Sequence, residues 1–517
     1  MSKKKHNQER RRFVKGVGAV GGSALLGTTG VVTTQMARAA SHKRCVFGMG
    51  TVPTTADTMD PVYRTSGSDG IYNNAVYEGL VYRDPDLTPR PGLAESWSAS
   101  ADGSEWTFKL QREATFHNGK PLVAADVIYT YNRIIDPDVG SSGASNFASI
   151  DPDGMVAVDD HTVRIKLTAA DVDFPNTTVF SQSMIVPEGA GAELSTNPIG
   201  TGAFKPDGFT PGDIVNRFVK NENYWRPGQP GIDELDIIGI GEREARVAAL
   251  LGGQIDIAAQ LNPASLGSLE GNSDFQILEN DVGTSTIAYC QMDTPPFDNN
   301  DVRLAIKYAT NRQQMLDLYY QGRGAPMNDT PIPGFIEGGL PGVRELSVAK
   351  AKEHLSRAGY PDGIDLSLEF AKFTNEDQWA TIWQQQLAEA GIRVELQQRP
   401  TDGYWGDVWI QDGHPFAFSG WNVRPTHAAL GLWYVSTANW NESRFKSETF
   451  DANYAKARAT VNTAERIKLY HACIKEVQDN AGHFVPFIQA FMDGASSKVS
   501  GWTPTVGTLP FGRIVIG

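Results

Sequence analysis

Two short segments of the chain alternate hydrophobic and polar residues, which is the pattern of a half-buried β-strand. They are residues 106–110 (Trp-Thr-Phe-Lys-Leu) and residues 162–167 (Thr-Val-Arg-Ile-Lys-Leu). Each follows a polar turn, at residues 100–103 and 158–161, and the Asp-Gly pair in the first turn favours a positive φ. The pattern therefore predicts two strands, each with one face against a core.

The hydrophobic positions of several longer segments recur with the period of an amphipathic helix. These helical segments are residues 124–135, 243–251, 302–308, 311–320, 348–358, 376–390 and 450–479. Strand-like segments lie between them at residues 255–257, 365–370 and 393–396. Helices that alternate with short strands predict an α/β architecture of packed layers.

The first forty residues follow a different pattern, that of an export signal. Residues 10–15 (Arg-Arg-Arg-Phe-Val-Lys) precede a Gly- and Ala-rich apolar run, and residues 37–39 (Ala-Arg-Ala) offer small residues for cleavage. The pattern resembles a twin-arginine signal, which carries folded proteins across the bacterial inner membrane. It predicts a periplasmic protein from which residues 1–39 are removed.

The alternative interpretation of this segment is an uncleaved membrane anchor. Six glycines from Gly16 to Gly30 dilute the apolar run, whereas an anchor needs about 20 strongly hydrophobic residues. The same run contains Gly-x-Gly-x-x-Gly at residues 16–21. We do not interpret it as a dinucleotide-binding motif, because such a motif must follow a strand and open a helix.

The composition is that of an ordinary globular protein, with 40% hydrophobic and 21% charged residues among 517. The roughly 480 residues after the signal are too many for one hydrophobic core and predict two or three lobes. The formal net charge is −14 for the whole chain and becomes about −21 without the basic signal. Such an acidic chain is not expected to bind nucleic acid.

The sequence lacks the usual motifs of an enzyme or of a cofactor site. No Cys-x-x-Cys, His-Glu-x-x-His, Gly-x-Ser-x-Gly or haem-attachment motif is present. Of Cys45, Cys290 and Cys473, an exported protein can pair two, and the spacing does not say which. We expect no cofactor and no metal; a secreted hydrolase or redox enzyme is a remote alternative.

A series of short motifs from residue 59 onward gives the chain a family resemblance. The motifs are Met-Asp-Pro at 59–61, Tyr-Glu-Gly-Leu-Val-Tyr at 77–82, Pro-Gly-Leu-Ala-Glu-Ser-Trp at 91–97, Phe-His-Asn-Gly-Lys-Pro-Leu at 116–122, Pro-Ile-Gly-Thr-Gly-Ala-Phe at 198–204, Asn-Glu-Asn-Tyr-Trp at 221–225, Leu-Gly-Gly-Gln-Ile-Asp at 251–256 and Pro-Pro-Phe-Asp at 295–298. Together they resemble the peptide/nickel class of bacterial extracellular solute-binding proteins, the receptors of ABC importers. Most of these residues fix turns or fill the core, so they indicate the fold and not the ligand.

The resemblance implies the two-lobed periplasmic-binding-protein fold, in which a hinge joins two α/β lobes around the ligand. The first lobe is discontinuous and enlarged by an extra subdomain; we expect it over residues 40–290 and 480–517. We expect the second lobe over residues 291–479. Closure of the hinge around a ligand is the working motion, and the protein, expected to be a monomer, then delivers the ligand to the transmembrane subunits of an ABC permease.

One residue departs from the pattern of the peptide-binding members. In them, an Asp three residues after a Gly-Trp pair binds the free α-ammonium of the peptide. Residues 419–426 here read Ser-Gly-Trp-Asn-Val-Arg-Pro-Thr, which places Arg424 at that position. A guanidinium would repel an ammonium by on the order of several kcal/mol, whereas its planar fork suits a carboxylate or a phosphate. An internal ion pair with Asp407 or Asp412 is the structural alternative.

Aromatic residues gather around Arg424 in the sequence. Five of the eleven tryptophans lie between residues 405 and 440, and aromatic walls around one polar group are typical of small-molecule sites; the same tryptophans are equally typical of a core. The candidate ligand-binding residues are Arg424, Trp421, Asn422, Trp405, Thr65 and Ser66, the last two by a match to a family position near the pocket.

The sequence thus predicts an ABC-importer receptor whose ligand carries an anionic group. Candidates are an opine-like amino-acid derivative, an acidic or N-blocked peptide, or another small carboxylate. A conventional dipeptide or oligopeptide receptor is the alternative, because one changed position does not prove a changed specificity. Nickel uptake is disfavoured, since the nine histidines are scattered.

Overall fold

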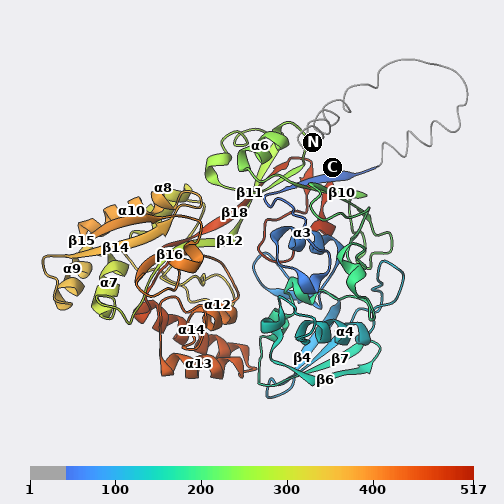
Figure 1. Ribbon diagram of the computed structural model, residues 1–517, viewed down its shortest axis with the longest axis horizontal. Coiled ribbons are helices and arrows are strands. Elements are labelled where there is room, and N and C mark those ends of the chain that lie inside the picture. Colours follow the sequence, from blue (N-terminus) through green and yellow to red (C-terminus); the bar gives the residue numbers. More distant parts are fainter. Residues whose placement is uncertain (1–41) are drawn as a thin grey trace, which may run out of the picture. The chain divides into compact units, whose positions relative to one another are not determined.

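One large mixed sheet of twelve strands runs through the protein (Figure 1). The computed structural model describes residues 42–517, so the predicted export signal lies outside the described residues. The strand order is β15 (Ile392–Arg399), β14 (Ile364–Ala371), β16 (Phe416–Asn422), β12 (Phe275–Cys290), β18 (Phe487–Ser496), β11 (Ile257–Leu261), β1 (Arg44–Met49), β10 (Glu234–Gly239), β9 (Val215–Lys220) and β8 (Phe204–Pro206). Two short strands, β13 (Gly324–Pro326) and β17 (His483–Phe484), pair with β18 and β12.

The long strands β12 and β18 join the two halves of this sheet. β12 pairs with β16 over residues 284–290 and with β18 over residues 275–284. The register shifts between Asn280 and Thr284, where a Cβ on Gly283 would lie 1.8 Å from the carbonyl oxygen of Gln489. Glycine is therefore required at this crossing, because any side chain would separate the two strands.

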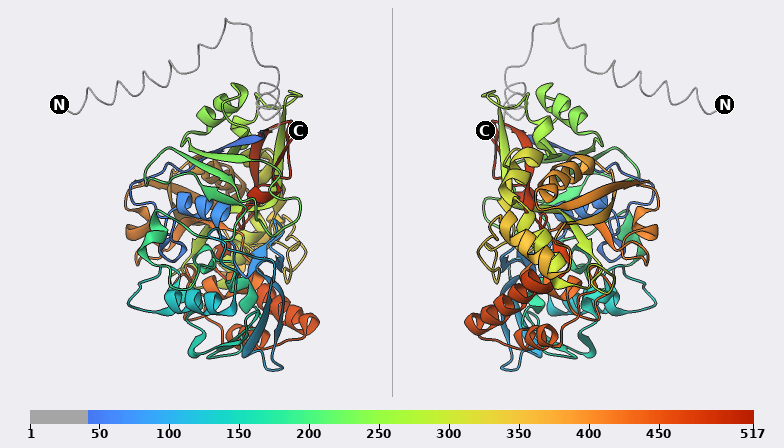
Figure 2. Two further views of the ribbon diagram at one scale, coloured as in Figure 1. Left: turned by 90° about the vertical axis from the view of Figure 1, so that its right-hand side faces the viewer. Right: turned by 90° about the vertical axis from the view of Figure 1, so that its left-hand side faces the viewer.

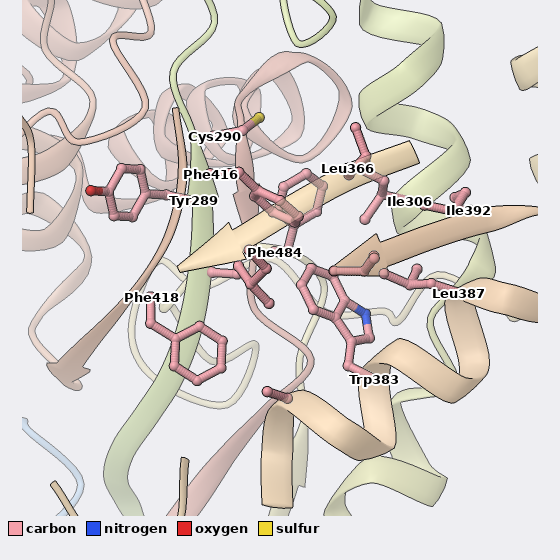
Figure 3. Close-up of a cluster of buried hydrophobic side chains, with 14 of the residues drawn as sticks. Tyr289, Cys290, Ile306, Leu366, Trp383, Leu387, Ile392, Phe416, Phe418 and Phe484 are labelled. Atoms are coloured by element: carbon pink, nitrogen blue, oxygen red, sulfur yellow. The ribbon is translucent and has the colours of Figure 1, made fainter. Parts of the chain in front are cut away.

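A large aromatic and aliphatic core lies on the side of β14, β15 and β16 (Figure 3). The helices that contribute to it are α7 (Asn300–Ala309), α8 (Arg312–Tyr320), α9 (Val348–Arg357) and α10 (Glu376–Glu389). Trp379 and Trp383 of α10 are almost fully buried, and the rings of Trp379 and Phe418 meet edge to face at 4.5 Å. The predicted helices at 302–308 and 311–320 and the predicted strands at 365–370 and 393–396 are confirmed here.

Three helices form a second core beside this one: α12 (Thr426–Trp433), α13 (Glu448–Arg458) and α14 (Thr463–Asn480). The periodicity predicted continuous helix over residues 450–479, but the structure divides it between α13 and α14. The physical reason is local. The β-branched Thr460 and Val461 disfavour helix, and the Asn462 side chain accepts a hydrogen bond from the backbone N–H of Glu465 at 3.1 Å, which starts a new helix.

The other half of the large sheet has its own core, with α3 (Gly67–Val76) packed near β8 and α6 (Arg243–Leu251) packed near β11. The predicted strand at residues 255–257 begins later than expected, because β11 starts at Ile257. Ile255 is nevertheless buried. Its apolar side chain produced the strand-like pattern without belonging to the ladder.

A separate four-stranded antiparallel sheet has the order β4 (Ala94–Ala99), β5 (Glu105–Leu110), β7 (Thr162–Leu167) and β6 (Ile150–Asp159). It packs with α4 (Ala124–Ile135) around a core of its own. The alternating segments at 106–110 and 162–167 are therefore strands, as predicted. Together with the large sheet, these layers confirm the α/β prediction.

The remaining elements are short. They are the strand pairs β2 (Val81–Arg83) with β3 (Pro89–Pro91) and β19 (Val499–Ser500) with β20 (Val515–Ile516), and the helices α5 (Phe174–Thr177) and α11 (Tyr404–Asp407). Cys45, Cys290 and Cys473 are buried and free, so none forms a disulfide. Between residues 42 and 517, no helix has both the length and the apolar character of a membrane span.

Candidate functional site

Arg424 lies between the end of β16 and the start of α12. Trp421 and Asn422 close β16 opposite Ser285 and Thr284 of β12, and Pro425 precedes the first residue of α12. Pro425 cannot continue a strand ladder, and its fixed φ suits a helix start. The chain therefore passes from strand to helix through residues 423–425, and Arg424 lies in this short connection.

The Arg424 guanidinium has no acidic partner among the described residues. Arg424 is partly buried, its Nε is buried without a hydrogen-bond partner, and burial lowers its pKa. The alternative of an internal ion pair with Asp412 is not formed, because Asp412 pairs with Arg444 at 2.5 Å. No ion pair joins Arg424 to Asp407 within residues 42–517 either. The positive charge of Arg424 is thus left unbalanced in this structure.

Arg83 is a second guanidinium at this place, and sequence reasoning missed it. It ends β2, and its Nη2 donates a hydrogen bond to the backbone oxygen of Asn176 at 2.9 Å. Its buried Nε has no partner in the described part of the chain. Burial and, second, the charge of Arg424 lower the pKa of Arg83 to about 10. The motif at 77–82 ends one residue before Arg83, so only the folded chain identifies it.

A cavity has Asn176, the partner of Arg83, and Pro425, the neighbour of Arg424, in its wall, whereas Arg83 and Arg424 are not among its lining residues. It is lined by Asp86, Asp173 and Asn176 from the first half of the chain, and by Glu337, Pro425, His427 and Tyr470 from the second half. Asn176 is the acceptor for Arg83, and Pro425 is the neighbour of Arg424 in the sequence. The cavity is therefore formed between two parts of the chain that are far apart in sequence.

The five predicted tryptophans form one connected cluster. The Trp421 ring lies 5.1 Å from Trp433, 5.2 Å from Trp440 and 5.9 Å from Trp409, and Trp405 lies 5.9 Å from Trp409. Their exposure differs. Trp433 is fully buried, whereas 47% of Trp405 and 39% of Trp440 are exposed. Trp433 is thus a core residue, whereas Trp405, Trp409, Trp421 and Trp440 are all at least partly exposed.

Glu442 fixes the orientation of two of these rings. Its fully buried carboxylate accepts hydrogen bonds from Nε1 of Trp409 at 2.6 Å and from Nε1 of Trp421 at 3.0 Å. His483 approaches the same carboxylate at 3.0 Å. These hydrogen bonds hold the Trp421 ring in place before any ligand arrives.

Trp405 belongs to this cluster and also has a contact outside it, and the remaining predicted site residues are Asn422, Thr65 and Ser66. Trp405 stacks on Phe373 with ring centroids 5.3 Å apart, and Asn422 is exposed at the end of β16. The Ser66 hydroxyl caps α3 by accepting from the backbone N–H of Asp69. Thr65 beside it is exposed. Among the described residues, no hydrogen bond joins Thr65 or Ser66 to Trp421 or Arg424.

Helices α13 and α14 are the orange-red helices at the lower edge of Figure 1 and of both views in Figure 2. A polar contact, here named the 171–173 contact, joins them to the segment between β7 and α5. The backbone N–H of Val172 donates to the oxygen of Arg458 at 2.9 Å, and Asp171 pairs with Arg458. The Tyr470 hydroxyl donates to the carboxylate of Asp173. This contact lies at one side of the cavity, which Asp173 and Tyr470 both line.

Burial alone would raise the pKa of Asp173. The charges of His427 and Arg458 and the hydrogen bond from Tyr470 outweigh burial and hold that pKa below its ordinary value. Burial lowers the pKa of His427 to about 4, although the charge of Asp173 opposes this shift. Within residues 42–517, no group of three His, Cys, Asp or Glu side chains is placed to hold a metal ion.

Comparison with known proteins identifies the class. The family model of the bacterial extracellular solute-binding proteins, family 5 Middle, matches residues 88–443. The glutathione-binding protein GsiB of Pectobacterium atrosepticum is 26% identical over 487 residues, which cover 89% of this chain and 91% of that protein.

Two solved structures extend the similarity. AgaA from A. tumefaciens R10, in complex with agropinic acid, gives a TM-score of 0.72 at 26% identity and covers 92% of this chain and 99% of its own. The ABC transporter-associated periplasmic binding protein DppA of Helicobacter pylori, in complex with the peptide STSA, gives a TM-score of 0.72 at 24% identity and covers 93% and 99%.

The fold has two α/β halves joined by β12 and β18, and a cavity lies between distant parts of the chain. This is the architecture of a two-lobed solute-binding protein. The chain belongs to the bacterial extracellular solute-binding proteins, family 5. It is the substrate-binding component of an ABC importer, as the sequence predicted, and its relatives are binding proteins and not enzymes.

Proposed function

We propose that this protein captures a small solute with a carboxylate or another anionic group and delivers it to an ABC permease. One observation carries the proposal: Arg424 is partly buried, directly precedes Pro425 of the cavity wall, and has no acidic partner among the described residues. Burying an unpaired charge is unfavourable, and an anionic ligand would supply the partner. Opine-like amino-acid derivatives, acidic peptides and N-blocked peptides all carry such a group.

The comparisons support an anionic ligand without naming it. AgaA was solved with agropinic acid, and an acid is the kind of ligand that Arg424 requires. The likeness to DppA with its bound peptide concerns the fold alone at 24% identity. A conventional peptide with a free α-ammonium is therefore the second candidate, and it would have to bind beside Arg424 without facing it.

We assign roles to the remaining candidates on the same basis. Trp421 and Trp405 would form aromatic walls, and Asn422 would offer an amide at the end of β16. Thr65 and Ser66 would approach from the first lobe. We retain residues 40–290 and 480–517 for the first lobe and 291–479 for the second, with β12 and β18 as the segments that cross between them.

The test is a ligand screen with a matched pair of variants. Thermal shift and calorimetry would compare the wild type with Arg424→Gln and with Arg393→Gln, whose exposed guanidinium pairs with Asp365 at 2.6 Å. A ligand that binds only the folded state raises the melting temperature by mass action. We expect acidic ligands to shift the wild type and Arg393→Gln but not Arg424→Gln. Free-amine peptides that shift all three proteins equally would overturn the proposal in favour of a conventional peptide receptor.

We also propose that the protein reaches the periplasm by the twin-arginine route and works there as a monomer. The support is the segment Arg10-Arg11-Arg12-Phe13 ahead of an apolar run. Replacing Arg10 and Arg11 by Lys should retain the protein in the cytoplasm when cell fractions are compared by immunoblot. Unchanged export of the Lys variant would exclude this route.

A further inference from the structure

A second cavity lies within the part of the chain that we expect to form the first lobe. Its volume is about 90 Å³, against about 30 Å³ for the cavity beside Asp173, and this is room for several water molecules or for one small molecule in their place. All its lining residues fall within 74–229 and 508–513. The second cavity is therefore formed by one lobe, and closure of the hinge is not needed to build it.

Three arginines line this second cavity: Arg83, Arg226 and Arg513. The guanidiniums of Arg226 and Arg513 lie 5.2 Å and 5.3 Å from the centre of the Tyr82 ring, which also lines the cavity. Nη2 of Arg513 donates to the Tyr82 hydroxyl at 2.8 Å. An aromatic face attracts a cation, so one ring holds two positive charges at the same part of the wall.

Two carboxylates line the second cavity as well, but the protein already engages both. Glu78 accepts hydrogen bonds from Nε1 of Trp225 at 2.6 Å and from the hydroxyl of Tyr224 at 2.9 Å. Asp84 accepts from Nε of Arg90 at 2.7 Å. Three arginines and two acids leave the lining with a formal charge of +1, so an anion is favoured over a cation in this cavity.

Two hydrogen-bond donors of the same wall lack a well-formed partner. Tyr77 is 2% exposed, and its hydroxyl lies near the backbone of Ile199 but makes no well-formed hydrogen bond with any residue between 42 and 517. The buried Nε of Arg83 has no partner there either, although Nη2 of Arg83 is held by the backbone oxygen of Asn176 at 2.9 Å. Buried donors are nearly always satisfied, so a ligand that brings acceptor oxygens would complete this wall.

We propose that the second cavity is a further ligand site, which holds a small oxyanion inside the first lobe, apart from the solute bound between the lobes. A carboxylate and an inorganic phosphate share the chemistry that the wall requires, because both offer several acceptor oxygens to guanidinium forks and to a hydroxyl group. The volume of the cavity admits a small anion and not a peptide. The proposal goes beyond the function proposed above and does not depend on Arg424.

Thermal shift and calorimetry with two separate probes, acetate and inorganic phosphate, would test this site. The informative variants are Tyr77→Phe, which removes one hydroxyl, and Arg513→Gln, which removes a guanidinium that is 43% exposed at the cavity wall. A hydrogen bond to a charged ligand is lost in each, so we expect the affinity for the bound probe to fall roughly tenfold or more.

Each variant has a matched control. Tyr131→Phe removes another buried hydroxyl that makes no well-formed hydrogen bond within the described chain, but Tyr131 belongs to the core of the four-stranded sheet and does not line the second cavity. Arg393→Gln removes an exposed guanidinium that pairs with Asp365. Both controls, and Arg424→Gln, should bind the probe like the wild type.

The outcomes separate this site from the one between the lobes. If Tyr77→Phe and Arg513→Gln weaken binding and the controls do not, the probe that binds more tightly assigns the anion as a carboxylate or a phosphate. Phosphate also stabilises folded proteins by exclusion from their surface, so equal shifts in all variants would overturn the site. Loss of binding in Arg424→Gln alone would overturn it too, while supporting the proposed function. Binding of neither probe to the wild type would also refute it.

Discussion

The 171–173 contact predicts that one hydroxyl group at the wall of the cavity controls ligand affinity by stabilising the closed form. Tyr470 lies on α14, in the range expected for the second lobe, and donates a hydrogen bond to Asp173, in the range expected for the first. Tyr470→Phe removes only the hydroxyl. If the hinge separates these segments when it opens, the variant loses the bond in the closed form and nothing in the open form.

The magnitude follows from the charge of the acceptor. A hydrogen bond to a charged group contributes roughly 1.5–3 kcal/mol, and about 1.4 kcal/mol corresponds to a tenfold change in an equilibrium constant. His427 at 3.7 Å and Arg466 at 4.0 Å remain beside Asp173 in the variant, so the lower end of that range is the better estimate. Closure should then become on the order of tenfold less favourable, and the apparent affinity should fall by the same factor.

Tyr454→Phe is the matched control. The Tyr454 hydroxyl donates to the backbone oxygen of His427 at 3.0 Å, and both residues lie in the range expected for the second lobe. Its loss should lower the melting temperature slightly without changing ligand affinity. Calorimetry with a ligand from the screen, together with small-angle scattering with and without it, would measure binding and closure. Unchanged affinity in Tyr470→Phe, or equal losses in both variants, would refute the reasoning.

Three further predictions concern stability and the tryptophan cluster. Burial lowers the pKa of His427 to about 4 from 6.5. Between these two pH values the unfolded chain binds a proton at His427 that the folded chain does not bind. The free energy of unfolding should therefore fall as the pH drops from 6.5 to 4, and it should fall less steeply in His427→Gln. Urea denaturation at several pH values would measure both. Glu442→Gln should weaken the hydrogen bond to Nε1 of Trp421 and lower the free energy of unfolding by about 1–3 kcal/mol. An unchanged tryptophan emission spectrum would contradict the change at Trp421. Trp383→Ala should lower it by about 3–5 kcal/mol in urea denaturation, because Trp383 is only 1% exposed; a loss below about 1 kcal/mol would contradict the packing seen here.

Much of the fold was predictable because periodicity reports which face of an element is buried. The strands around Trp106 and Val163 and the helix that contains Ile306 follow directly from the spacing of apolar residues. The break at residues 459–462 was not predicted, because apolar spacing continues across it. Only the capping side chain of Asn462 signals the new helix.

The site was predictable only in part. Arg424 was found because a motif marks its position, and Trp421 because it belongs to the same motif. Arg83 carries no local sequence signal. It stands out only because the folded chain brings no acidic side chain of the described residues into an ion pair with it. The sequence also could not separate Trp433, a core residue, from the half-exposed Trp405, because burial of a tryptophan depends on the neighbours that the fold supplies.

The three free cysteines give this protein a built-in reporter of local opening. Cys45, Cys290 and Cys473 are each fully buried in a different hydrophobic core, and burial raises the pKa of every one of these thiols. Alkylating reagents need an exposed thiolate, so each thiol becomes reactive only when its own core opens. Pulsed alkylation with mass spectrometry would therefore measure the opening free energies of the three cores separately, without any engineered label, and would show which core a bound ligand protects.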